Sequence, residues 1–189
     1  MLDINQIYKT FNAGTVNEKR ALNGLDLHLQ EGDFVTVIGG NGAGKSTMLN
    51  AIAGTWFVDE GSIVIDGVDV TRLSEHKRAK YLGRVFQDPM TGTAASMQIE
   101  ENLALAARRG KKRTLRIGIT AKEREEYKRQ LEILGLGLEN RLTASVGLLS
   151  GGQRQALTLL MATLQKPKLL LLDEHTAALD PKTAAKVLE

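Results

Sequence analysis

The nine residues GGNGAGKST, at positions 39–47, constrain the fold more than any other part of the chain. Residues 39–46 match the phosphate-loop pattern G-x-x-x-x-G-K-[ST], and the apolar stretch FVTVI stands directly before them. Glycines let backbone N–H groups turn inward around an anion without interference from a Cβ, and the positive end of a following helix points at the same anion. The segment therefore predicts a central strand of a parallel sheet over residues 34–38, a phosphate-binding loop, and a helix through residues 48–54.

The side chains of this phosphate loop (residues 39–47) have expected tasks. Lys45 should reach the β- and γ-phosphates of a nucleotide, and the hydroxyl of Ser46 should hold Mg²⁺. A chance glycine-rich turn is the alternative, and the strand expected before the loop and the helix expected after it count against it. The predicted nucleotide ligands are Gly39, Asn41, Gly42, Ala43, Gly44, Lys45, Ser46 and Thr47.

A second apolar stretch, KLLLL at residues 168–172, ends in two carboxylates, Asp173 and Glu174. Ligands in parallel α/β sheets bind beyond the carboxyl ends of the strands. Asp173 is therefore expected to complete the Mg²⁺ shell through water, and Glu174 to polarise the attacking water. A base in this position contributes on the order of 10²–10⁴-fold to a rate. A merely polar end to the strand is the alternative, which the phosphate loop upstream makes less attractive.

A second glycine-rich helix start lies at residues 150–153, in LSGGQRQALTLLMA. Ser150 and Gln153 have the S-x-x-Q spacing of a capping box, so a well-capped helix is one interpretation. Gly151 and Gly152 at a helix N-terminus also suit an anion, so a second phosphate site is the other. The residues alone leave both interpretations open.

The remaining patterns predict an antiparallel part followed by a mainly helical part. Residues 2–8 and 25–29 alternate apolar and polar side chains as half-buried antiparallel strands do, and residues 63–71 read as a hairpin with an Asp66-Gly67 turn. Residues 84–86 are a short buried strand. Residues 90–165 are mostly helical, with a capping box at residues 120–123. Tyr127, Leu131 and Leu134 then recur at helical spacing before a C-terminal Gly135.

The order of these motifs resembles the ATP-binding subunits of ABC transporters over nearly the whole chain. Phosphate loop, Gln87, LSGGQ, LLLLDE and AALD at residues 177–180 follow one another as they do in that family. The resemblance implies an α/β P-loop NTPase fold with a mainly parallel sheet, an N-terminal antiparallel β subdomain and a helical insert. It implies one domain over 1–189, divided into a nucleotide-binding core (1–87), a helical signature subdomain (88–165) and a Walker B strand with D-loop (166–189).

The resemblance also explains the second helix start. In the family two ATPase subunits pack head to tail around two ATP molecules, and LSGGQ of one subunit caps the γ-phosphate held by the other. The resemblance thus assigns ATP contacts to Ser150, Gly151, Gly152 and Gln153. It further implies that Phe11 stacks on adenine, with an ordinary core aromatic as the alternative, and that Gln87 touches Mg²⁺ and the attacking water. Asp180 would communicate between the two sites.

Two departures from the family bear on activity. His175 stands where the family has proline, and the family's switch histidine would follow about thirty residues later, beyond Glu189. The expectation is a core that lacks its C-terminal part, binds Mg·ATP weakly and turns it over slowly. A non-catalytic nucleotide-binding fragment is the corresponding alternative.

Partners and location follow from the same resemblance. Residues 88–107 fall where the family docks on a membrane permease, although any one of them could equally be a core residue of the insert. A separate ATPase polypeptide is more usual for importers, which implies an extracytoplasmic solute-binding protein and a small solute such as an amino acid. The absence of cysteine, of a signal peptide and of an apolar run near the roughly 20 residues that span a bilayer predicts a cytoplasmic chain on the inner membrane face.

A basic cluster, RRGKKR at residues 108–113, raises a rival function on nucleic acid or ribosomes. The net charge of +3 is mild, and no aromatic residues alternate with the basic ones as base stacking would need. A solvated loop or a contact with anionic lipid are the other interpretations. We therefore expect no nucleic-acid partner.

Overall fold

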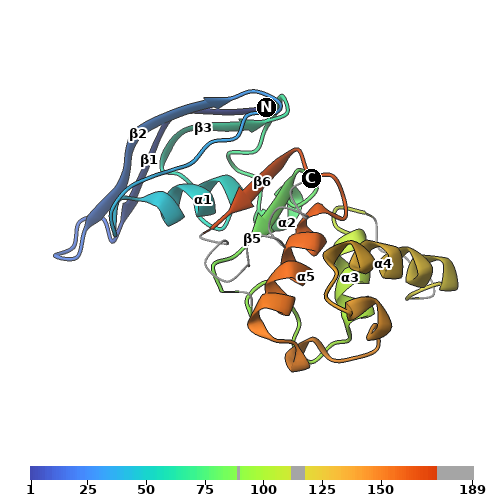
Figure 1. The fold of residues 1–189 in the computed structure, drawn as a ribbon. Coiled ribbons are helices and arrows are strands. Elements are labelled where there is room, and N and C mark those ends of the chain that lie inside the picture. Colours follow the sequence, from blue (N-terminus) through green and yellow to red (C-terminus); the bar gives the residue numbers. More distant parts are fainter. Residues whose placement is uncertain (89, 112–117, 174–189) are drawn as a thin grey trace. The chain divides into compact units, whose positions relative to one another are not determined.

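The computed structural model describes residues 1–88, 90–111 and 118–173. The chain forms two compact units, Met1–Leu82 and Gly83–Glu189, whose helices and strands are labelled in Figure 1. The elements of the first unit are β1 (Leu2–Phe11), β2 (Lys19–Leu29), α1 (Lys45–Ala53), β3 (Glu60–Ile65), β4 (Val68–Asp69) and α2 (Glu75–Arg78). Those of the second are β5 (Leu82–Val85, which starts at the boundary), α3 (Ile99–Ala107), α4 (Ala121–Leu134), η1 (Leu138–Asn140), η2 (Val146–Leu148), α5 (Gly151–Thr163) and β6 (Leu169–Leu172).

The first unit contains the predicted antiparallel strands. Its sheet has the order β2-β1-β3-β4, and the three pairings are antiparallel. The predicted hairpin is confirmed, because Asp66 and Gly67 join β3 to β4 with φ angles of 51° and 75°. Two consecutive positive φ angles are the geometry that a two-residue turn of the right twist needs.

A bulge in β1 explains why its sequence alternates only in part. Leu2, Ile4 and Ile7 are buried, so the apolar side chains are first two and then three residues apart. The register with β2 shifts between Ile4 and Ile7, and Gln6 has a φ of 44°. The carboxylate of Asp26 accepts the backbone N–H of Gln6 at 2.7 Å. The extra residue therefore returns Ile7 to the buried face.

The central strand predicted over residues 34–38 is not found in the structure. These residues belong to no strand, and the side chains of Phe34 and Ile38 are 81% and 91% exposed. A strand exists only where a neighbour accepts its ladder hydrogen bonds, and an apolar sequence does not supply that neighbour. The strands β5 and β6 of the second unit instead pair with each other in a two-stranded parallel sheet.

Helix α1 begins at a point where only glycine fits. Its N-cap, Gly44, has a φ of 90°, and a Cβ placed there would lie 2.5 Å from the carbonyl oxygen of Ala21 in β2. The loop before the helix can therefore lie against β2 only because residue 44 has no side chain.

The other end of α1 is fixed by a buried arginine that no sequence pattern indicates. The side chain of Arg78 is fully buried and donates from Nη1 to the carbonyls of Ala51 and Ile52, in the last turn of α1. Its Nε and Nη2 donate to the carbonyls of Leu73 and Thr71. Burial lowers the pKa of this guanidinium, which a nearby carboxylate partly opposes. A cation at the negative end of the helix stabilises it.

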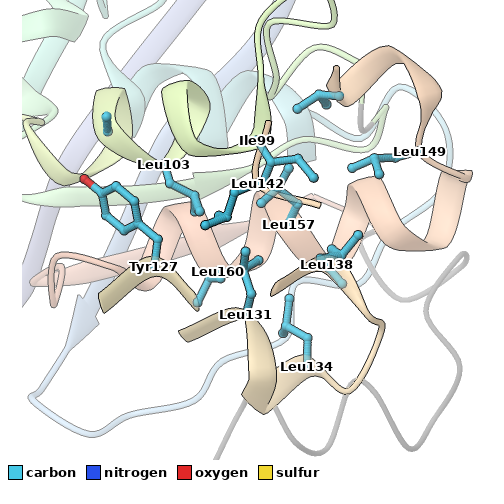
Figure 2. Packing of buried hydrophobic residues seen from close by; sticks show 13 residues of the cluster. Ile99, Leu103, Tyr127, Leu131, Leu134, Leu138, Leu142, Leu149, Leu157 and Leu160 are labelled. Carbon is cyan, nitrogen blue, oxygen red and sulfur yellow. The ribbon is translucent and has the colours of Figure 1, made fainter. Parts of the chain in front are cut away.

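In the second unit, α3, α4 and α5 share one apolar core (Figure 2). The capping box at Thr120 and Glu123 forms as predicted, and Gly135 ends α4 with a φ of 65°. The buried members of this core are Ile99, Leu103, Ala104, Tyr127, Leu131, Leu134, Leu138, Leu142, Val146, Leu149, Ala156, Leu157 and Leu160. The three residues predicted from helical spacing therefore face the inside of the unit.

The geometry at Gly44 predicts a strong and local effect of one methyl group. Gly44→Ala should lower the free energy of unfolding by at least about 2 kcal/mol, because a residue with a Cβ is strained at positive φ and would also collide with β2. Gly40→Ala is the matched control, since a Cβ there meets no atom within 4 Å. Urea unfolding followed by tryptophan fluorescence would measure both. Equal stabilities of the two variants would contradict the assignment of Gly44.

Candidate functional site

The phosphate loop lies at the surface of the first unit. Gly42 and Gly44 have φ angles of 81° and 90°, so two of its residues use backbone conformations that favour glycine. The ammonium of Lys45 folds over the loop and donates to the carbonyls of Gly39 and Gly40. The loop is thus a glycine-rich turn with one cation beside it, which fits a nucleotide phosphate.

Two helices of the structure have N-termini without a compensating acid. Of the five described α-helices, α2, α3 and α4 have a glutamate in the first turn, whereas α1 and α5 have none. Each helix N-terminus carries about half a positive charge, which an acidic side chain or a bound anion stabilises. The two helices that lack the acid are those that begin at the two glycine-rich segments.

The helix start at residues 150–153 is compatible with both interpretations of its sequence, a capping box and an anion site. The hydroxyl of Ser150 accepts the N–H of Gln153 at 3.3 Å, and the side chain of Gln153 accepts the N–H of Ser150 at 3.2 Å, so the capping box is present. Ser150 and Gly151 are exposed, and a Cβ on Gly151 would meet no atom within 4 Å. The cap is compatible with an approaching anion because the first N–H groups of a helix have no partner within it.

The second unit brings Gln87 and Asp173 to the ends of neighbouring strands. The N–H of Asp173 donates to the carbonyl of Val85 at 3.2 Å, two residues before Gln87. Val85 also lies in one buried cluster with Leu159 of α5, so this sheet packs on that helix. Lys45 and Ser46 belong to the first unit. Glu174, His175 and Asp180 lie outside the described residues.

Phe11, at the end of β1, meets an aromatic partner that the sequence did not indicate. Its ring packs edge to face with Trp56, with 5.3 Å between the ring centroids, and the ammonium of Lys9 lies 5.7 Å from its centroid. Trp56 is the only tryptophan of the chain and is 42% exposed. In the sequence, only its position two residues after Gly54, the C-cap of α1, distinguishes this tryptophan.

The segment predicted to dock on a permease is partly core. Ile99, Glu100 and Leu103 are buried, and Glu100 accepts two hydrogen bonds from the guanidinium of Arg124, which lower the pKa of its carboxyl group. Met90 and Leu105 are exposed, at 53% and 58%. For the buried residues the core interpretation is therefore the correct one, and the exposed residues remain available to a partner.

Two arginines of the basic cluster at residues 108–113 have partners inside the unit, whereas Lys111 is exposed. Arg108 pairs with Glu123 at 3.0 Å. Arg109 is half-buried and donates to the carbonyls of Ala162 and Gln165, at the end of α5. Lys112 and Arg113 lie outside the described residues. Guanidinium groups that hold helix ends and ion pairs are poor candidates for a nucleic-acid contact, which weakens the rival function.

No helix within the described ranges is both long and apolar enough to cross a lipid bilayer.

Comparison with known proteins gives relatives over the full chain. The chain is 44% identical over 189 residues to a tyrosine transport ATP-binding protein of Clostridioides difficile. The aligned residues cover all of this chain and 75% of that protein. It is 36% identical over 193 residues to the methionine import ATP-binding protein MetN of Escherichia coli K12, covering 53% of that protein. The chain thus spans three quarters of the first relative and about half of the second.

Solved structures of the same kind agree in fold. A dimeric ATP-binding cassette in a post-hydrolysis state, bound to ADP and Pi, matches with a TM-score of 0.83 and 30% identity over 100% of this chain and 80% of that one. A nucleotide-free ATP-binding cassette from an ABC transporter matches with a TM-score of 0.76 and 28% identity, over 99% of this chain and 74% of that one. The expected α/β P-loop NTPase fold is confirmed. A family profile described as ABC transporter matches residues 22–177, and the chain belongs to this family as an ATP-binding protein.

Proposed function

We propose that this chain is the ATP-binding and ATP-hydrolysing subunit of an importer, and that it powers uptake of an amino-acid-type solute through a partner membrane permease. The observation that carries the proposal is the pair of glycine-led helices, α1 and α5, that lack an acid in the first turn. One such helix suffices to bind a phosphate group. A second one on the same chain has a use if each ATP is held between two chains.

In this proposal the first unit binds the nucleotide. The N–H groups of the phosphate loop surround the phosphates, Lys45 moves from the carbonyls of Gly39 and Gly40 to phosphate oxygens, and Phe11 with Trp56 forms the aromatic platform for adenine. Stacking on such a platform is worth about 1–3 kcal/mol per base.

Mg²⁺ would be held by Ser46, Gln87 and Asp173 together with phosphate oxygens, and its charge would neutralise those oxygens when bound. This donor set suits the ion, because Mg²⁺ in nucleotide sites is bound through one or two carboxylates and keeps several waters. Glu174 would accept a proton from the attacking water.

Two copies would then pack head to tail. The signature turn (residues 150–153) of one copy caps the γ-phosphate held by the phosphate loop of the other, so that ATP favours the closed dimer. Such a change is a population shift, because ATP contacts both chains only in the closed form. Closure would move the permease, and hydrolysis would reopen the dimer.

The names of the relatives support the solute class. Tyrosine and methionine are both amino acids, and the two relatives are named for their transport and import. An importer of this kind works with an extracytoplasmic solute-binding protein, and its ATPase sits at the cytoplasmic face of the membrane. The transported solute itself contacts those partners and not this chain.

The first prediction from this proposed function concerns Lys45. Lys45→Ala should raise the Kd for Mg·ATP by at least about 100-fold, because the phosphates lose the charged partner that the loop supplies. Quenching of Trp56, the only tryptophan, reports the binding directly. Lys77→Ala, at an exposed lysine of the same unit, is the control and should bind as the unchanged chain does. Equal affinities of the two variants would refute the role of the loop.

The second prediction separates the cap of α5 from its contact with ATP. In a Glu174→Gln background, ATP should produce a dimer, and Ser150→Asp should abolish it. Aspartate caps a helix as well as serine and favours the positive helix end, so stability should be kept, whereas its charge repels a phosphate.

Thr120→Asp, at the N-cap of α4 in the same unit, is the matched control and should leave dimerisation unchanged. Light scattering after gel filtration measures the dimer, and thermal unfolding measures the stability. A Ser150→Asp chain that still dimerises with ATP would show that the signature turn is only a helix cap.

The third prediction concerns the permease. The chain purified from detergent-solubilised membranes should carry a polytopic membrane protein in stoichiometric amount, and Leu105→Glu should reduce its recovery several-fold. Ile133→Glu is the matched control, since Ile133 on α4 is 54% exposed and Leu105 on α3 is 58% exposed. Recovery of ribosomes or nucleic acid without a membrane protein would favour the rival function instead.

A further inference from the structure

Arg154 is a buried cation at the beginning of α5. Its side chain is 6% exposed, and its Nη2 donates to the carbonyls of Val146 and Gly147, at 3.2 Å each. Its Nε is buried and has no hydrogen-bond partner in the described part of the chain. Burial of a polar N–H without a partner costs stability, so packing alone does not explain an arginine at this position.

The guanidinium lies behind the signature turn. Arg154 is the fourth residue of α5, and its N–H donates to the carbonyl of Ser150, the N-cap. Side chains in a helix point back toward its N-terminus, and the contacts with residues 146 and 147 place this charge at the helix start. A cation there is repelled by the positive end of the helix, and its charge adds to the attraction of that helix end for an anion.

The two carbonyls that Arg154 holds belong to a segment tied to the predicted docking region. The N–H groups of Val146 and Gly147 donate to the carbonyls of Met97 and Ala95, at 3.0 and 2.8 Å. The hydroxyl of Ser145 also donates to the carbonyl of Ala95, at 2.7 Å. Arg154 therefore connects the start of α5 to residues 95–97 through a single intervening backbone segment.

We propose that Arg154 is a positioning residue for the γ-phosphate contact of the signature turn. It fixes residues 146 and 147 against the start of α5 and places a buried positive charge behind Ser150 and Gly151. The inference rests on the proposed function, because it assumes that the signature turn meets an ATP held by a second copy. Arg154 itself acts through the turn and does not touch the nucleotide.

The chain offers a matched control at the opposite end of the same helix. Arg109 also donates from Nη2 to two carbonyls, those of Ala162 and Gln165, at 3.1 and 3.0 Å. Helix α5 has 13 residues, a length of about 20 Å, and the effect of a charge on a helix end fades within one turn. Loss of Arg109 should therefore reduce stability without reaching the signature turn.

The test compares Arg154→Met, Arg154→Lys and Arg109→Met in the Glu174→Gln background. Arg154→Met should weaken ATP-driven dimerisation about tenfold, the loss expected for hydrogen bonds to a charged group, with less than twofold change in ATP affinity of the monomer. Arg154→Lys keeps the charge and should recover part of the dimerisation. Arg109→Met should change neither quantity by more than about twofold. Sedimentation measures the dimer, and Trp56 fluorescence measures the monomer affinity.

Amide hydrogen exchange of the nucleotide-free chain provides a second readout that needs no dimer. Arg154→Met should speed exchange at the capping-box amides of Ser150 and Gln153 about tenfold, and Arg109→Met should speed it only near residues 162–166. If the background chain does not dimerise with ATP, the proposed head-to-tail dimer is wrong, and exchange alone decides the role of Arg154. Unchanged exchange at residues 150–153, or equal effects of the two methionine variants on dimerisation, would overturn the proposal. Arg154→Lys serves the exchange test if Arg154→Met does not fold.

Discussion

The positive end of a short helix, left without a neutralising side chain, is the constraint on which much of this structure depends. In α1 that end begins at Gly44, where the approach of Ala21 in β2 leaves no room for a Cβ. A helix start of this kind is unfavourable until an anion arrives, because its N–H groups have no partner within the helix. The surrounding sheet must therefore hold the helix in place while its N-terminus stays open.

Helices α1 and α5 both have an N-terminus without an acid, and both are stabilised at the other end in the same way. Neither helix has a basic residue in its last turn, and each receives an arginine from another part of its unit. Arg78 donates to carbonyls in the last turn of α1, and Arg109 to carbonyls at the end of α5. Burial lowers the pKa of both guanidinium groups. Each helix is thus fixed at its negative end and left available at its positive end.

The features that the sequence predicted well are local ones. Capping boxes at Thr120 and Ser150 and the turn at Asp66 depend on a few neighbouring residues, so their patterns suffice. The strand expected from Phe34 onward depends on a partner far along the chain, and an apolar run carries no information about that partner. The inward contact of Arg109 is not predictable from RRGKKR, because nothing in that run of basic residues indicates that one guanidinium turns inward and bonds to the end of a helix. The roles of Glu174 and Asp180 stay predictions.

If two copies share each ATP, the division of the chain into two units acquires a physical reason. The phosphate loop and Phe11, which we propose stacks on adenine, lie in the first unit, and the signature turn lies in the second. The phosphates held by the loop of one copy would then attract the signature turn of another copy. A ligand shifts an equilibrium only by its difference in affinity for the two states, and here that difference is the set of contacts made by the signature turn. Residues such as Arg154, which hold that turn without touching ATP, then determine how strongly ATP favours closure.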